Sequence, residues 1–460
     1  SGEDQIHRLR REKIITNLKE KTNTINVTQG NSRIVREFEL WDKSTIPNTE
    51  HKLNLWVREG WSDNENTVLN EIRAEGNDSP LSYLFVKKSR DTELKAEILK
   101  YISAVQTINA MGTPTTPEGE QAKNSMKTRQ LNAEKAIKEL VERICDESTV
   151  YLAGGNTIQK GTLKENIQEA LNSIADRQFP DFKSKADFQN WGQALTKAQG
   201  GAPDALKSIK YNGDAEKHPI SAEILRFIGN NTKSGKEIRN QFMKSPYGWP
   251  QDAIDTILIV LKNAEQISSS ANELRTGTIN QANFKKEVHI LSASDKIAIR
   301  KLLQEAAIIC PPNKEIFPFS NEYIKKLMDL ASKVSGDAPR PETIKTELIK
   351  EIENKEGNER LLEILLMKDE LQNKFELWNK QAETAKKREP LWKLLTDLYD
   401  FASDGEDMEN LSKEIDAIRD NRLLFQEPDP IQPLLNEVTE KLLNILNGKK
   451  HTYNEIYDLR

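Results

Sequence analysis

The stretch PISAEILRFIGNNTKSGKEIRNQFMKSPYGWPQDAIDTILIVLKNA, residues 219–264, contains the most regular pattern in the chain. Apolar residues recur every three or four positions within three segments, and turns containing glycine or proline separate these segments, which predicts three helices. The next stretch, EQISSSANELRTGTI, alternates around a polar turn as the two strands of a hairpin do. Three helices followed by a hairpin is the order of a winged helix, so we expect a winged-helix-like domain over residues 216–291.

One part of this stretch, GNNTKSGKE, has the look of a phosphate-binding loop. Such a loop needs four residues between its glycines and a Ser or Thr after its lysine. Here Gly229 and Gly235 enclose five residues, and Glu237 follows the lysine. Because a carboxylate at that place would repel phosphate, we interpret the segment as the turn between the first two helices, with Ser234 as the N-cap of the second.

Basic side chains gather on the second helix and around the hairpin, where they could bind the phosphates of nucleic acid. Asp252 and Asp255 argue against that, because they open the third helix, which enters the major groove in the usual docking. The net charge of -5 gives no general attraction for DNA either. A contact with DNA and a contact with a partner protein therefore both stay open. The candidate contact residues are Lys233, Lys236, Arg239, Lys244, Arg275, Lys285 and Lys286.

The remaining pattern predicts a mostly α protein with a smaller α/β portion. Residues 1–49 predict a helix and a hairpin that could complete an upstream domain. Residues 50–160 predict an α/β domain, with strands near 52–57, 81–88 and 148–155 and two long helices, 91–110 and 118–145, covering the sheet. Residues 161–215 form a helical connector in this interpretation. From residue 292 to residue 460 only helical patterns occur, which predicts a C-terminal helical bundle. The stripe Ile364, Leu371, Phe375 and Trp378 is typical of its core.

Catalytic and metal-binding patterns are absent from the sequence. Its five histidines are scattered, and its two cysteines form no CxxC pair. The strand end YLAGG, with Gly154 and Gly155, could present backbone amides to an anion, although a tight strand exit explains it more simply. We expect no catalytic, cofactor-binding or metal-binding residues in this chain. No run of about eighteen apolar residues is present, and the two cysteines do not suggest a disulfide framework, so we expect a cytoplasmic location.

Five stretches, in this order along the chain, carry a family resemblance: LWVREGW, AMGTPTTPEGEQAKNSMKTRQLNAEKAI, VYLAGG, SPYGWPQDAIDTILIVL and EPDPIQPLLNEVTEKL. They extend over most of the chain from Leu55. Together they resemble the large P-loop ATPase of the BREX bacteriophage-exclusion systems, the BrxC/PglY type.

This resemblance implies the middle and C-terminal region of a bacterial phage-defence ATPase. The family acts with a DNA methyltransferase and a phosphatase-like protein. Its ATP and magnesium bind in an N-terminal P-loop domain, and none of those binding residues matches a position here. We therefore expect a non-enzymatic fragment that serves as an assembly and interaction scaffold for other defence components, with double-stranded DNA as a further candidate partner. The alternative is a winged-helix DNA-binding regulator, and a third hypothesis is an enzyme built around Gly154 and Gly155.

Overall fold

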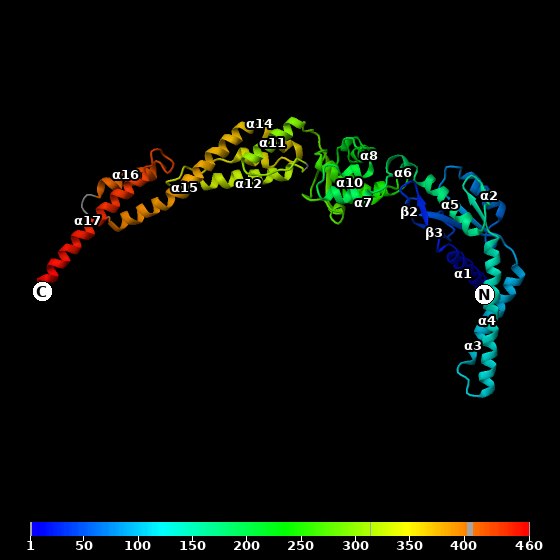
Figure 1. Ribbon diagram of the computed structural model, residues 1–460. Helices are drawn as coiled ribbons and strands as arrows, with labels where there is room; N and C mark the ends of the chain where they lie inside the picture. Colours follow the sequence, from blue (N-terminus) through cyan, green and yellow to red (C-terminus); the bar gives the residue numbers. More distant parts are fainter. Residues whose placement is uncertain (1, 313, 403–407, 460) are drawn as a thin grey trace. The chain divides into compact units, whose positions relative to one another are not determined.

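A computed structural model describes residues 2–312, 314–402 and 408–459 (Figure 1). The protein is mostly helical with a smaller α/β portion, as the sequence predicts. The chain divides into two compact units, which are described separately. The first unit comprises residues 1–227, 233–259 and 274–282, and the second comprises residues 228–232, 260–273 and 283–460. No helix along the described residues is both long enough and apolar enough to cross a membrane.

The first unit contains a five-stranded mixed sheet of order β3-β4-β5-β6-β7. Strands β3, β4 and β5 run parallel, whereas β5, β6 and β7 pair antiparallel. The three strands predicted near residues 52–57, 81–88 and 148–155 are present as β4, β5 and β6. The sheet is only partly parallel, because β6 pairs antiparallel with β5. The bounds are β3 (Phe38–Trp41), β4 (Leu53–Glu59), β5 (Ser82–Val86), β6 (Thr149–Leu152) and β7 (Thr157–Ile158).

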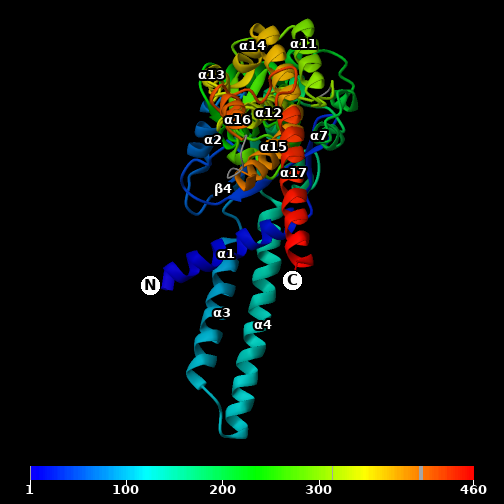
Figure 2. The same cartoon turned by 90° about the vertical axis from the view of Figure 1, so that its left-hand side faces the viewer.

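The helices that pack on this sheet differ from the prediction. Helix α5 (Leu163–Gln178) contacts β4, β5 and β6. Helix α2 (Glu65–Ala74) packs Val68 and Ile72 against the aromatic residues of the sheet. The prediction that the two long helices cover the sheet is wrong: α3 (Asp91–Met111) and α4 (Pro117–Asp146) pack chiefly against each other and form a long helical hairpin, which we call the arm (Figures 1 and 2).

The N-terminal segment packs within the first unit. Helix α1 (Gly2–Thr22) contacts α3, α4 and α5. Strands β1 (Val27–Gln29) and β2 (Ile34–Arg36) form the predicted hairpin. Strand β3 then joins the parallel part of the sheet beside β4. The helix and hairpin over residues 1–49 are therefore built into the same unit as the α/β portion.

The predicted order of three helices and two strands is present, but the second strand lies later than expected. Strand β9 (Ile267–Ser269) pairs antiparallel with β10 (Asn283–Lys286), so the prediction of a hairpin complete by residue 279 is wrong. Residues 274–282 form a loop that a buried arginine holds, as described below. The preceding elements are α6 (Pro180–Lys185), α7 (Trp191–Gln199), η1 (Ala205–Ile209), η2 (Ala215–Lys217), α8 (Pro219–Ile228), β8 (Lys233–Ser234), α9 (Gly235–Met243) and α10 (Gln251–Asn263), and η3 (Ile279–Gln281) precedes β10.

The described part of the second unit that follows β10 is helical, and it has two apolar cores. Ile364, Leu371 and Trp378 lie in one core and Phe375 packs against it, which confirms the predicted stripe. The sequence predicts one helix over residues 359–385, which carries the whole stripe, and another over residues 390–401. The prediction of one helix for the stripe is wrong, because α14 ends at Leu366 and α15 begins at Lys368, so Ile364 lies on a different helix from Leu371 and Trp378. Helix α15 then continues through Pro390 to Ala402. Of the acidic stretch 404–410, residues 404–407 lie outside the described residues. The helices are α11 (Ala293–Glu305), α12 (Phe317–Lys333), α13 (Glu347–Glu353), α14 (Gly357–Leu366), α15 (Lys368–Ala402), α16 (Glu409–Asp420) and α17 (Ile431–Asp458).

Candidate nucleic-acid or partner interface

The segment that looks like a phosphate loop is a helix cap. The Ser234 hydroxyl accepts a hydrogen bond from the Glu237 amide at 3.2 Å, and the Glu237 carboxylate accepts one from the Ser234 amide at 2.7 Å. This reciprocal pair is a capping box at the start of α9, and it confirms Ser234 as the N-cap. The hydrogen bonds from Ser234 hold the pKa of Glu237 below its usual range. Glu237 therefore stabilises the first turn of α9.

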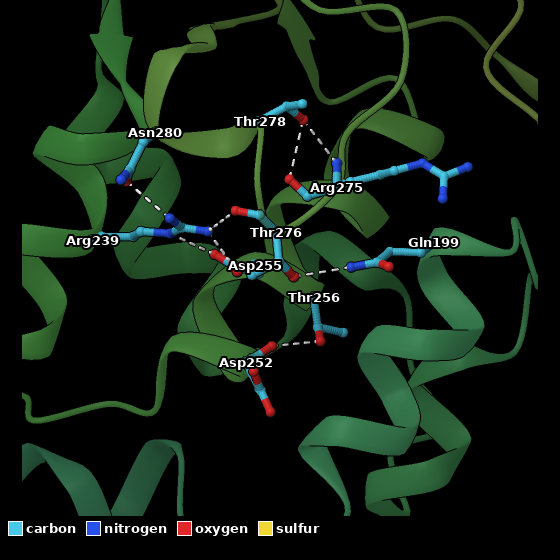
Figure 3. A network of polar contacts seen from close by, with 9 residues as sticks. All are labelled: Gln199, Arg239, Asp252, Asp255, Thr256, Arg275, Thr276, Thr278 and Asn280. Atoms are coloured by element: carbon cyan, nitrogen blue, oxygen red, sulfur yellow. Dashed lines mark hydrogen bonds and ion pairs between the residues drawn. The ribbon is translucent and has the colours of Figure 1, made fainter.

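Arg239 lies inside the first unit rather than on its surface (Figure 3). Its guanidinium donates two hydrogen bonds to Asp255 on α10, at 2.9 and 2.7 Å. It also donates to Asn280 Oδ1 and to the Thr276 carbonyl, each at 2.9 Å. The Arg239 side chain is 8% exposed and that of Asp255 is 0% exposed. Arg239 thus links α9, α10 and the loop of residues 274–282 through hydrogen bonds. Because it is buried, Arg239 is not part of the candidate contact surface.

Burial and the pairing with Arg239 have opposing effects on the pKa of Asp255. Burial raises the pKa of Asp255, and the hydrogen bonds and charge of Arg239 oppose that rise. The expectation that Asp255 faces an approaching duplex is wrong, because its side chain has no exposed surface. The sequence signal for this was an aspartate inside the apolar run AIDTILIVL, which is more typical of a paired buried charge than of a solvated one.

Helix α10 has little surface with which to read DNA. Every side chain of residues 253–259 is buried. Asp252, in the first turn of the helix, is exposed. In a winged helix that docks in the usual way, this third helix enters the major groove. A helix whose side chains pack into the protein on all sides cannot present donors and acceptors to base edges. Base-specific contact through α10 is therefore not supported by the geometry.

The turn between α9 and α10 is a packed aromatic cluster. Trp249 is 1% exposed and stacks on Phe242 with ring centroids 4.7 Å apart. Tyr247 meets Trp249 edge-on at 4.9 Å. Gly248 has φ +58°, a backbone angle that favours glycine, and a Cβ there would lie 2.3 Å from the Phe179 ring. These aromatic rings hold the turn, so they are not platforms for stacking bases.

The other candidate basic residues differ in exposure. Lys233 is half-buried, with its ammonium 4.9 Å from the centre of the Phe227 ring. Lys236 is exposed on the first turn of α9, and Lys244 is half-buried at the end of that helix. Arg275 is exposed in the loop before η3, where Figure 3 shows its guanidinium pointing away from the buried network. Lys285 and Lys286 are exposed on β10, which belongs to the second unit.

The strand exit YLAGG offers no anion site through its glycine amides. The Gly154 amide donates to the Ile72 carbonyl at 2.9 Å, and the Gly155 amide donates to the Leu152 carbonyl at 3.1 Å. Their φ angles of +91° and +97° explain why glycine occupies both positions. The simpler interpretation, a tight exit from β6, is the one that the hydrogen bonds support.

Two comparisons with known proteins give no match. The search of protein-family models finds none for this chain, and the search of solved structures finds none either. Within residues 2–312, 314–402 and 408–459, no group of three or more His, Cys, Asp or Glu side chains is placed to hold a metal ion.

Proposed function

We propose that this chain is a non-catalytic region of a BREX phage-defence ATPase and serves as an assembly and interaction scaffold for other defence components. The ATP and magnesium of such a protein would bind in its P-loop domain. The partners would be the DNA methyltransferase and the phosphatase-like protein of the same system. The observation that carries the scaffold role is the arm formed by α3 and α4.

The outer part of the arm, residues 105–132, is largely helical although none of its side chains is more than half-buried. Ile98 on α3 and Ile137 on α4 are fully enclosed closer to the base, and Ala104 is the buried residue of α3 nearest the tip. No side chain of residues 105–132 is buried. Helices in proteins draw most of their stability from packing an apolar face. Helices α3 and α4 pack against each other, but the side chains of residues 105–132 are at most half-buried, among them Val105 and Ile108. This shallow packing supports a role in which a partner covers more of the arm.

Apolar side chains and a groove lie along the arm. Leu131 is 64% exposed and Leu99 is 47% exposed. A groove of about 480 Å³ runs between α3 and α4, lined among others by Leu99, Met126 and Arg129. An exposed surface that combines apolar residues with charged ones is typical of a protein-binding site. One of the stretches that carry the resemblance, residues 110–137, includes the tip of this arm and continues along α4 to the buried Ile137.

The fold of the arm does not depend on these exposed leucines, which makes them suitable for a test. The variant Leu99→Glu/Leu131→Glu should keep the helical circular dichroism and thermal stability of the parent chain. It should weaken binding to the methyltransferase or the phosphatase-like protein at least about tenfold, because apolar anchors dominate such interfaces. Biolayer interferometry with each purified partner measures this.

The matched control is Leu366→Glu, which changes another leucine that is 77% exposed, at the end of α14. This control should bind as the parent chain does. Equal binding by the parent chain and the arm variant would remove the arm from the interface. If neither partner bound even the parent chain at micromolar concentration, the scaffold proposal itself would fail.

A further inference from the structure

A cavity of about 260 Å³ lies between three helices of the second unit, α11, α12 and α15. Among the residues that line it are Leu302 and Glu305 on α11, Tyr323 on α12 and Phe375 on α15. Tyr323 is fully buried and Phe375 is half-buried, with their ring centroids 6.4 Å apart. Ligand sites in proteins are concave and largely apolar with a few polar groups, and a cavity just below their usual volume favours a small occupant.

The hydroxyl of Tyr323 is a buried polar group for which the fold provides no partner. Tyr323 is 0% exposed, and no described residue forms a hydrogen bond with its hydroxyl. Burial raises the pKa of Tyr323, and the charge of the Glu305 carboxylate raises it further, so the hydroxyl stays protonated. Because Glu305 acts on this hydroxyl and both residues line the cavity, the hydroxyl faces the cavity. Buried hydroxyls are nearly always paired in proteins, which makes an occupant of the cavity the natural partner.

The charged groups of the lining favour a cation. Glu305 and Glu376 contribute two carboxylates, against the one ammonium of Lys380. Gln372 donates a hydrogen bond to the Glu376 carboxylate at 3.3 Å, whereas Glu305 and Lys380 form no ion pair with another described residue. The Glu305 carboxylate is thus available to a ligand beside the Tyr323 hydroxyl. Aromatic rings in the wall add to the attraction, because their faces are negative.

We propose that this cavity binds a small primary amine in its ammonium form. The ammonium donates hydrogen bonds to the Tyr323 hydroxyl oxygen and to the Glu305 carboxylate, while the alkyl part packs against Leu302 and Phe375. An anion would meet the two carboxylates, and a purely apolar molecule would leave the hydroxyl unpaired. The site lies in the second unit and uses no residue of the arm, so it is independent of the scaffold role.

Saturation-transfer difference NMR of the whole chain tests the proposal, with butylamine as the probe. Butylamine should bind with a dissociation constant of about 1–10 mM, as expected for so small a ligand. Butanol and butyrate have the same chain length, and each should bind at least about fivefold more weakly, because one has no charge and the other has the wrong charge. Butylamine that does not bind at about 50 mM, or that binds no better than butanol and butyrate, would overturn the proposal.

Two variants test the residues of the site. Tyr323→Phe keeps the ring and removes a hydroxyl that no described residue pairs, so the thermal stability should not fall, whereas the dissociation constant for butylamine should rise at least about fivefold. Glu305→Gln should raise it about tenfold, because the ammonium loses its charged acceptor. The matched control is Glu322→Gln, an exposed glutamate on α12 outside the cavity lining, and it should bind as the parent chain does. Unchanged binding in Tyr323→Phe and Glu305→Gln, or a loss of thermal stability in Tyr323→Phe, would overturn the proposal.

Discussion

Replacing Arg239 with leucine should destabilise the first unit strongly. The change removes both hydrogen bonds to Asp255, whose side chain is 0% exposed, and so leaves a buried carboxylate without its cation. Removing one partner of a buried ion pair costs about 3–5 kcal/mol, because the remaining charge stays desolvated. The Thr276 carbonyl and the Asn280 side chain lose a donor as well. We therefore expect a loss of about 3 kcal/mol or more in local stability.

Hydrogen–deuterium exchange of residues 274–282 measures this loss where it occurs. About 3 kcal/mol corresponds to exchange roughly 100-fold faster in the loop that Arg239 holds. The double variant Arg239→Leu/Asp255→Leu should recover much of the protection, because it removes both charges. Lys236→Leu, on the exposed side of the same helix, should change little. If Arg239→Leu left the exchange of this loop unchanged, the structural role of Arg239 would be refuted.

Three further outcomes follow from the described contacts. Burial lowers the pKa of His218 to about 4 from 6.5, so the unfolded chain takes up this proton first as the pH falls. The stability of the folded chain should therefore decrease between pH 6.5 and 4, and thermal melts of a His218→Phe variant over this pH range should lose that dependence. Burial raises the pKa of Glu287 to about 7 from 4.5, so the folded chain takes up this proton first and becomes more stable as the pH falls through 7. In chemical denaturation, Glu287→Gln should therefore stabilise the second unit more at pH 8 than at pH 5. A larger stabilisation at pH 5 would contradict the burial of Glu287. Titration with duplex DNA should show at most weak binding without sequence preference, and Lys236→Glu should reduce the slope of log binding constant against log salt concentration by about 1. Clear sequence specificity would contradict the burial of α10.

Local chemistry explains what the sequence could predict. The capping residue Ser234 and the apolar stripe from Ile364 to Trp378 each depend on a few neighbouring residues, and the structure has both. The strands β4, β5 and β6 were likewise recognisable from their β-branched and aromatic content. Such features follow from short-range patterns that tertiary packing does not alter.

The errors concern contacts between residues distant in sequence. Strand β9 pairs with a strand that begins only at Asn283, after the loop that Arg239 holds, and the sequence of that loop gives no sign of this pairing. The lysines on and beside α9, Lys233, Lys236 and Lys244, made Arg239 look like one of a basic cluster. Its position opposite Asp255 decides its burial. Likewise, α3 and α4 have enough apolar residues to cover a sheet, and only the three-dimensional arrangement shows that they cover each other.

The arm is the surface on which the proposed scaffold role depends most. Hydrogen–deuterium exchange of the whole chain, with and without a saturating amount of each purified BREX partner, measures directly which residues the partner covers. The proposed function predicts strong protection at residues 105–132, because no side chain there is buried in the free chain. Protection confined to other parts of the chain, with exchange at residues 105–132 unchanged by either partner, would contradict it.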